Sequence, residues 1–411
     1  MGRVSGVAQI PAPDSVPGTG VSTGSTVVTN ISLLVTNDPA AGPAPLGIMP
    51  GAAVVLDGDR VAWVGPSASA PAADQTFDAG GRAVLPGWVD SHSHLVFAGD
   101  RSAEFSARMS GAPYQAGGIL STVAATRAAS DAQLAALLQW RIEEMTAGGT
   151  TCIETKTGYG LTTVDEVRAA TIAAAGGVDV VTFLGAHLNA PEFTDPDEYL
   201  DLVCGPMIDA VAPHVQFIDV FCEEGAFNEA RTRRVLAAGL RKGLGLKVHG
   251  NQLGAGDGVR IAVDCGAVSV DHCTHLADRD IALLAGSDTV STLLPLCDLS
   301  TRQPPAPGRL LADAGVSIAI ASNCNPGSSY TSSMNLAVAL AVLQCGLTAD
   351  EAVAAATVGG ARALARDDVG VIAVGKRADL HVLEAPSHDY LAYRVGVPMT
   401  HAVWRKGARV R

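Results

Sequence analysis

The hydrophobic positions of this chain follow two patterns, one at its ends and another in its middle. In the segments Thr26–Val84, Val369–Leu383 and Ala402–Val410, short β-type runs are separated by turn signals such as Asp57-Gly58, which is typical of hairpins. In the middle, continuous apolar runs alternate with longer helix-like segments, as expected for buried parallel strands. The two β-rich ends therefore predict one small β-sandwich domain made from both termini.

Eight strand candidates follow one another through the middle of the chain. The first lies within Val84–Arg101, and the others are Thr150–Thr155, Val178–Ala186, Val215–Phe221, Gly245–Val248, Ala267–Val270, Thr289–Leu294 and Val316–Ala321. Apolar strands that alternate eight times with helices predict an α/β fold, the (β/α)8 TIM barrel. In that fold the chemistry lies at the C-terminal ends of the strands.

Helix-like segments lie between these strands. Asp131–Ala147, Asn228–Lys242 and Ala306–Ala314 are each followed directly by glycine, the residue that most often ends a helix. After the eighth strand, Thr348-Ala-Asp-Glu351 has the form of a capping box and predicts a helix that runs to about Ala365.

The patterns divide the chain into three parts. Residues 1–25 are rich in Pro, Gly, Ser and Thr and carry no signal-peptide pattern, so they predict a disordered tail. Residues 26–84 together with 367–411 form the composite β domain in this interpretation, and residues 85–366 form the barrel.

Composition narrows the choice of partners. The chain has 411 residues, 48% of them hydrophobic, and a formal net charge of −13. This charge argues against nucleic acid or an anionic membrane, which require clustered Lys and Arg, but leaves room for a small anionic substrate held by one arginine. The eight cysteines include no CxxC pair and predict a reduced, cytoplasmic protein. We expect no membrane span, and either a monomer or a homodimer.

Histidines gather at the predicted strand ends. His92 and His94 are two residues apart, so on a strand they point to the same face and can hold one metal ion. The alternative is a polar strand end with two solvated histidines. His187, His249 and His272 also follow predicted strands, and Asn323 follows the eighth. If the barrel forms, these side chains meet at one end of it.

Several motifs carry a resemblance to a known family. They are Pro86–Phe97, Lys156–Leu161, Phe183–His187, Asp219–Glu223, Asp271-His272 and Asn325–Ser328. In this order they resemble the imidazolonepropionases of the amidohydrolase superfamily. The resemblance implies hydrolytic opening of 4-imidazolone-5-propanoate to N-formimidoyl-L-glutamate, a step of histidine degradation.

The resemblance also implies roles for individual residues. One zinc or iron ion would be bound by His92, His94, His249 and the residue at position 323. Arg101 would pair with the propionate of the substrate, which suits the bidentate geometry of a guanidinium. His272 would hydrogen-bond the developing oxyanion or the attacking water. The remaining substrate contacts would come from Tyr159, His187, Gln252, Asn325, Gly327 and Ser328.

Two positions depart from the pattern of the family. Gln252 stands where many members have a glutamate that shuttles a proton, and an amide can only orient its partners by hydrogen bonds. Asn323 stands where the family has a metal-binding aspartate, and Asp298 is the acidic candidate to replace it. These departures leave two alternatives: a related amidohydrolase with another cyclic amide substrate or impaired activity, and a non-catalytic homologue that binds a ligand.

Overall fold

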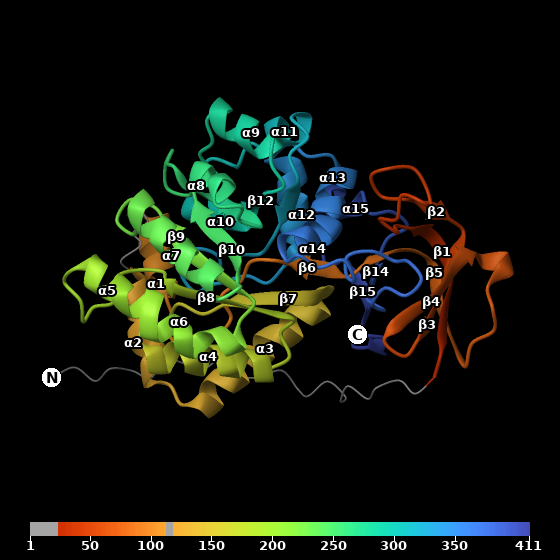
Figure 1. The fold of residues 1–411 in the computed structure, drawn as a ribbon. Coiled ribbons are helices and arrows are strands. Elements are labelled where there is room, and N and C mark those ends of the chain that lie inside the picture. Colours follow the sequence, from red (N-terminus) through yellow and green to blue (C-terminus); the bar gives the residue numbers. More distant parts are fainter. Residues whose placement is uncertain (1–23, 112–117) are drawn as a thin grey trace.

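The computed structural model describes residues 24–111 and 118–411, which form a barrel and a smaller sheet domain beside it (Figure 1). The predicted tail, residues 1–25, lies outside the described residues except for its last two positions. Among the described helices, none combines the length and apolar character needed to cross a bilayer.

Eight parallel strands form the barrel, in the order of the sequence. They are β6 (Trp88–Asp90), β7 (Thr150–Lys156), β8 (Val180–Ala186), β9 (Phe217–Cys222), β10 (Gly245–Gly250), β11 (Ser269–His272), β12 (Val290–Leu293) and β13 (Ile318–Ile320). The first and last strands meet just beyond their ends, where Asn323 N donates to His92 O (2.9 Å) and His94 N to Cys324 O (2.9 Å). Each strand overlaps one of the eight candidates, so the predicted barrel is confirmed.

Helices surround the barrel (Figure 1). They are α1 (Ser102–Met109), α2 (Ile119–Ala128), α3 (Asp131–Ala147), α4 (Thr163–Ala175), α5 (Pro196–Leu202), α6 (Ile208–Val211), α7 (Glu229–Arg241), α8 (Gly258–Asp264), α9 (Asp278–Ala285), α10 (Pro295–Thr301), α11 (Gly308–Asp313), α12 (Met334–Leu343), α13 (Ala349–Ala354), α14 (Gly360–Ala363) and α15 (Tyr390–Tyr393). Helix α3 has the predicted bounds and starts with a capping box between Ser130 and Gln133, which satisfies two backbone donors that the first turn leaves open.

The helix predicted from Thr348 to about Ala365 is present and runs to Ala363, but it is not α-helical throughout. Its capping box is present, but a π-helical turn at Ala355–Gly359 separates α13 from α14. The two segments meet the barrel there: a Cβ on Gly359 would lie 2.2 Å from Ile318 O, and one on Gly360 would lie 2.3 Å from Val89 O. The close packing against β13 and β6 explains both glycines and the local change of helix.

The second sheet combines both ends of the chain, as predicted. Its strands run in the order β16-β15-β14-β5-β1-β3-β4, with β2 paired to β1. Their bounds are β1 (Thr26–Leu34), β2 (Met49–Pro50), β3 (Ala52–Asp57), β4 (Arg60–Pro66), β5 (Gln75–Pro86), β14 (Leu380–Leu383), β15 (Thr400–Arg405) and β16 (Ala408–Arg409). Val28, Val54, Leu380 and Trp404 share one core, so neither end can bury its apolar face without the other. The division at residues 84 and 366 stays a prediction.

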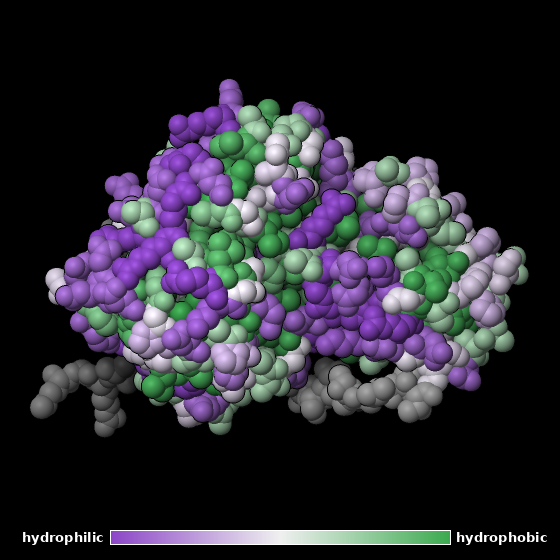
Figure 2. Space-filling model, viewed as in Figure 1, coloured by the Kyte–Doolittle hydropathy of each residue, from purple (hydrophilic) through white to green (hydrophobic). Residues whose placement is uncertain are grey.

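A buried ionic cluster fastens the small domain to the N-terminal end of the barrel strands. Asp179, just before β8, pairs with Arg377 (2.6 Å) and Arg405 (2.9 Å). Both arginines also donate to Thr151 O at the start of β7, at 2.8 and 2.9 Å. Burial alone would raise the pKa of Asp179, but the two arginines outweigh it and lower the pKa to about 2. On the face seen in Figure 2, hydrophilic residues gather over β15 and the C-terminal end of the chain nearby.

We expect Arg377→Met to lower the free energy of unfolding by about 3 kcal/mol at neutral pH, because two buried carboxylates, Asp179 and Asp379, lose a partner. The folded pKa of Asp179, about 2, lies below the unfolded value of ~3.9. The stabilisation is therefore complete above about pH 5 and is lost as the pH falls through 4 toward 2. Urea unfolding at a series of pH values measures this.

The matched control for that experiment is Lys242→Met. Lys242 pairs with Asp209, and the two side chains are 39% and 61% exposed, so the change should stay within about 0.5 kcal/mol. A difference between wild type and Arg377→Met that did not shrink in acid would contradict the role given to Asp179.

Candidate active site and metal centre

Three histidines meet at the C-terminal end of the barrel strands. His92 and His94 follow β6 and His249 lies on β10, and all three are buried, with ring nitrogens within 4.8 Å of one another. The Nε2 atoms of His92 and His94 are 3.3 Å apart. Two nitrogens bound tetrahedrally to one zinc at ~2.05 Å would be separated by about 3.3 Å. The three residues could therefore hold a metal ion.

Carboxylates on two other strands set the orientation of these rings. His92 Nδ1 lies 2.6 Å from Asp271 Oδ2, and His249 Nδ1 lies 3.0 Å from Asp219 Oδ1. A carboxylate accepts a proton donor, so each Nδ1 carries the hydrogen and each Nε2 keeps its lone pair. This arrangement of carboxylate, imidazole and metal position is the usual outer support of a histidine metal site. The donor set thus fits a divalent ion.

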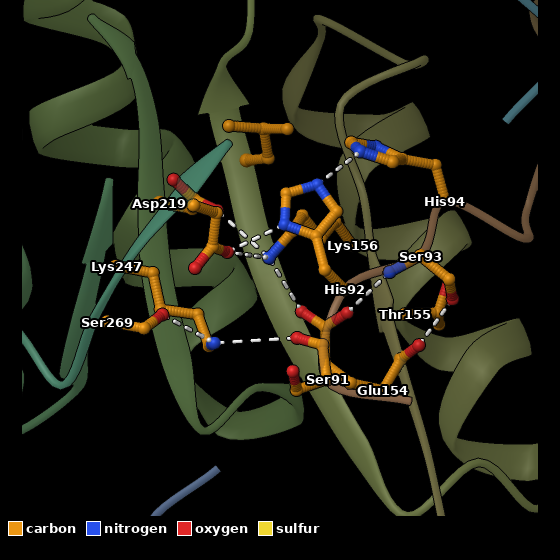
Figure 3. Close-up of polar contacts among 12 residues, drawn as sticks. Ser91, His92, Ser93, His94, Glu154, Thr155, Lys156, Asp219, Lys247 and Ser269 are labelled. Carbon is orange, nitrogen blue, oxygen red and sulfur yellow. Dashed lines mark hydrogen bonds and ion pairs between the residues drawn. The ribbon is translucent and has the colours of Figure 1, made fainter. Parts of the chain in front are cut away.

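The carboxylates are in turn held by one fully buried lysine (Figure 3). Lys156 Nζ, at the end of β7, lies 2.9 Å from Glu154 Oε1, 2.9 Å from Asp219 Oδ2 and 3.7 Å from Asp271 Oδ2. Burial would lower the pKa of Lys156, but the three carboxylates raise it above its usual value. Lys156 therefore stays charged and offsets the charges of the carboxylates that orient the metal-site histidines.

Strand β7 also fixes the backbone around these histidines. Glu154 Oε2 accepts from Ser93 N (3.0 Å), and Lys156 N donates to Ser93 O (2.8 Å). Two residues further along, Leu95 N donates to Thr155 Oγ1 (2.7 Å). The segment after β6 is thus hydrogen-bonded on both sides of His94 (Figure 3), which keeps its side chain aimed at the cluster.

Burial keeps His92, His94, His187 and His272 neutral, because it lowers the pKa of each. Burial, reinforced by Lys156, lowers the pKa of His92 to about 3, and burial likewise lowers the pKa of His187 to about 3. The pKa values of His94 and His272 are also lowered well below the ordinary range, chiefly by burial. A neutral imidazole has a lone pair to offer, so burial favours metal binding over protonation.

A pocket opens beside the histidine cluster. Ten of the twelve residues proposed from the sequence line it: His94, Arg101, Tyr159, His187, His249, Gln252, His272, Asn323, Asn325 and Ser328. Of the other two, His92 belongs to the cluster but is fully buried and does not line the pocket. Gly327 lies behind Arg101, where a Cβ would come within 2.2 Å of Nη1.

Two lining residues, Ile119 and Phe221, were not proposed from the sequence. Phe221 belongs to the Asp219–Glu223 motif at the end of β9, so its position near a strand end was a usable signal. Ile119 opens α2, which follows β6 at a distance along the chain. No local pattern points to it, because only the path of the intervening chain brings it to the pocket.

The loop after β13 is stabilised by hydrogen bonds of the Asn325 side-chain amide. Asn325 Oδ1 accepts from Gly327 N (2.8 Å) and Ser328 N (2.9 Å), and Asn325 Nδ2 donates to Asn323 O (2.7 Å). Asn323 has a φ of 52°, a left-handed conformation that asparagine tolerates better than most residues. The loop therefore presents two amides to the pocket, one from Asn323 and one from Asn325.

Asp298 does not replace the missing aspartate in this structure. Its carboxylate accepts from Thr274 Oγ1 (2.8 Å) and Ala306 N (3.2 Å), and Asp298 is not among the residues that line the pocket. Within the described residues, no carboxylate lines the pocket. Gln252 points its Nε2 to within 3.7 Å of Cys297 Sγ, so position 252 is likewise occupied by an amide with a local partner.

Comparison with known proteins shows which family this chain is similar to. Residues 224–409 match the model of the amidohydrolase family. A protein named imidazolonepropionase from Saccharopolyspora erythraea is 64% identical over 390 residues, which cover 94% of this chain and 99% of that protein. Another of that name, from Streptomyces coelicolor, is 58% identical over 387 residues, with the same coverage of 94% and 99%.

Solved structures share the fold at low identity. Atrazine chlorohydrolase from Arthrobacter aurescens, complexed with zinc, gives a TM-score of 0.70 at 19% identity over 93% of this chain and 94% of that one. An adenosine deaminase from Xanthomonas campestris with bound zinc gives 0.68 at 20% identity over 93% and 92%. At these identities the likeness concerns the fold alone.

The barrel, the histidine cluster at its C-terminal strand ends and the family match together define a hydrolase of the amidohydrolase superfamily. Within this superfamily, two relatives identify the family. Each is more than half identical to this chain over almost its whole length. The chain belongs to the imidazolonepropionase family, and the resemblance carried by the sequence motifs is confirmed.

We expect Asp271→Asn to weaken zinc binding by about 10- to 100-fold, because an amide no longer secures the Nδ1–H tautomer and the orientation of His92. Competition with a chromophoric chelator measures the affinity, and circular dichroism verifies that the variant is folded. Asp298→Asn is the control: its carboxylate bonds to Thr274 and Ala306, so its zinc affinity should equal that of the wild type. Equal losses in both variants would contradict the assignment.

Proposed function

We propose that this chain hydrolyses 4-imidazolone-5-propanoate to N-formimidoyl-L-glutamate, a step of histidine degradation. The observation that carries the proposal is the placement of Arg101 in the same pocket as the three-histidine cluster. An arginine suits the propionate of this substrate, and the histidines suit a metal ion beside the ring. The names of the relatives support the same reaction.

The reaction breaks the amide bond of the ring. The oxygen of water adds to the ring carbonyl carbon, the bond from this carbon to the ring nitrogen breaks, and a proton passes to that nitrogen. His92, His94 and His249 would hold the zinc or iron ion, with Asn323 at the fourth position. When bound, such an ion lowers the pKa of water and polarises a carbonyl group.

The residues of the chain then bind the substrate and move protons. Arg101 binds the propionate, while Tyr159 and His187, which follow strands β7 and β8, contact the imidazolone ring. Their rings lie next to each other, with centroids 5.4 Å apart. Asn325 and Ser328 border the pocket on the side of the β13 loop, and Gly327 contributes its lack of a side chain, which leaves space for Arg101.

We propose that His272 is the residue that accepts and donates the proton at the reacting atoms. It lies at the end of β11, lines the pocket, and its buried Nδ1 has no partner among the described residues. A neutral imidazole accepts a proton on one nitrogen and donates from the other, so His272 can serve both the oxyanion and the leaving nitrogen. Gln252 and Asn323 are amides and take no proton at neutral pH, so they orient water and substrate.

We further propose a cytoplasmic enzyme that acts on a small anionic molecule, as a monomer or a homodimer. All eight cysteines are free, which agrees with a reducing compartment. The formal net charge of −13 gives nucleic acid no general binding surface.

We expect the zinc- or iron-loaded protein to turn over imidazolone propanoate, observed as loss of substrate absorbance. Arg101→Gln should raise KM by at least ~100-fold, because one charge-assisted bidentate contact is lost inside a buried pocket. Metal content is assayed in each sample, so that a loss of activity is not confused with a loss of metal.

The variant Asn323→Asp runs beside the wild type and tests position 323. We expect both to be active, because in the wild type Gln252 and Asn323 orient the water while His272 moves the proton. Activity in Asn323→Asp alone would show that the pocket selects this substrate but position 323 limits turnover. No activity in either metal-loaded protein would contradict the proposed reaction.

A further inference from the structure

Arg101 has an acidic partner on the next turn of the chain. Its Nε donates to Glu104 Oε2 (2.9 Å) and its Nη2 to Glu104 Oε1 (2.7 Å). The carboxylate of Glu104, on α1, therefore contacts one side of the guanidinium with both oxygens. Arg101 itself is buried, at 6% exposure, and lines the pocket.

Two glycines form a narrow slot around this pair. A Cβ on Gly327 would lie 2.2 Å from Arg101 Nη1, and one on Gly118 would lie 2.3 Å from Arg101 Nη2 and 2.5 Å from Glu104 Oε2. Neither position has space for a side chain, so the backbone approaches the guanidinium closely at both glycines. These contacts limit the movement of the guanidinium, and the two hydrogen bonds to Glu104 limit its rotation.

A second arginine fixes the helix that carries Glu104. Arg108, also on α1 and buried, donates from Nη1 to Gly327 O (3.0 Å) and from Nε to Ser300 O (3.1 Å). It thereby ties α1 to the loop after β13 and to the end of α10. Its Nη1 also lies 3.9 Å from Glu104 Oε1. Two guanidinium groups and one carboxylate leave one net positive charge at this end of the pocket.

We propose that Glu104 is the positioning residue that aims the guanidinium of Arg101 at the carboxylate of the substrate. The inference rests on the carboxylate-binding role that the proposed function gives to Arg101. A long arginine side chain loses considerable rotamer freedom when it is held in one geometry. Glu104 holds it in advance, so the ligand meets a guanidinium that is already oriented.

Glu104 could also weaken binding of the substrate, because its negative charge repels a bound carboxylate. Two observations decide between the effects. The Glu104 side chain is 33% exposed, so water screens its charge toward the ligand. Its two hydrogen bonds act on a guanidinium whose side chain is 4% exposed, where water cannot replace them. Orientation therefore outweighs repulsion.

The test compares two ligands in the zinc-loaded protein by calorimetry: 3-(imidazol-4-yl)propanoate and the corresponding propanamide, which lacks the charge. In Glu104→Ala the Kd of the propanoate should rise about tenfold, while the Kd of the propanamide stays the same. Glu104→Gln keeps one acceptor oxygen and should give a smaller rise. In steady-state assays KM should rise in both variants, with kcat within about twofold of the wild type.

Glu384→Ala is the matched control. Glu384 pairs with Arg82 through the same two nitrogens, Nε (3.3 Å) and Nη2 (2.7 Å), but it lies in the small domain and should change neither Kd. An unchanged or lower Kd of the propanoate in Glu104→Ala would overturn the inference, as would an equal rise for both ligands, which would indicate general damage to the pocket.

Measurements on the same samples distinguish a failure of the proposed reaction from a failure of the inference about Glu104. If the wild type prefers the propanoate but does not open the imidazolone ring, the proposed reaction fails while the binding data still decide the role of Glu104. If the wild type turns over and the ligand preference does not change in Glu104→Ala, the inference about Glu104 fails alone. A wild type without preference for the propanoate would also overturn it.

Discussion

The buried contact of Lys156 with Asp219 and Asp271 is the interaction on which the rest of the site depends. All three side chains have no exposure to solvent, so each charge is costly unless the others compensate it. The two aspartates also accept from His249 and His92. The same carboxylates thus satisfy the lysine inside the barrel and determine which nitrogen of each histidine is available at its mouth.

This coupling explains why the candidate metal site draws on several strands. His92 follows β6, Asp219 lies on β9, His249 on β10 and Asp271 on β11, while Lys156 reaches the two aspartates from β7. A change of register in any of these strands would break one of the buried contacts that orient His92 and His249. Because an unpaired buried charge destabilises the fold by several kcal/mol, arrangements that separate these charges are disfavoured and the geometry of the site is maintained.

Charged side chains have different roles in the pocket and at the N-terminal end of the barrel strands. Among the described residues that line the pocket, Arg101 carries the one permanent charge, and its electrostatic preference is for a single anionic group. At the N-terminal end of the strands, Asp179, Arg377 and Arg405 are fully engaged with each other and with the backbone, so they join the two domains and face no ligand. Stability and recognition are placed at separate ends, as is usual for barrel enzymes.

Much of this protein follows from its sequence alone. Apolar strands and capped helices, such as the one that Ser130 begins, depend on neighbouring residues, and so does the shared face of His92 and His94. The positions of polar residues at predicted strand ends, together with the resemblance to the family, indicated the reaction class and ten residues of the pocket lining.

Other features are decided only by the tertiary structure, because they join residues that are far apart in the chain. His92 and Asp271 are 179 positions apart, and no local pattern pairs them. Asp298 was the acidic candidate for the metal site, yet the fold directs it to Thr274. Glu104 is near Arg101 in sequence, but only the folded barrel brings Gly327, from the loop after β13, against Arg101. Local propensity determined the elements, whereas the closure of the barrel decided which side chains meet.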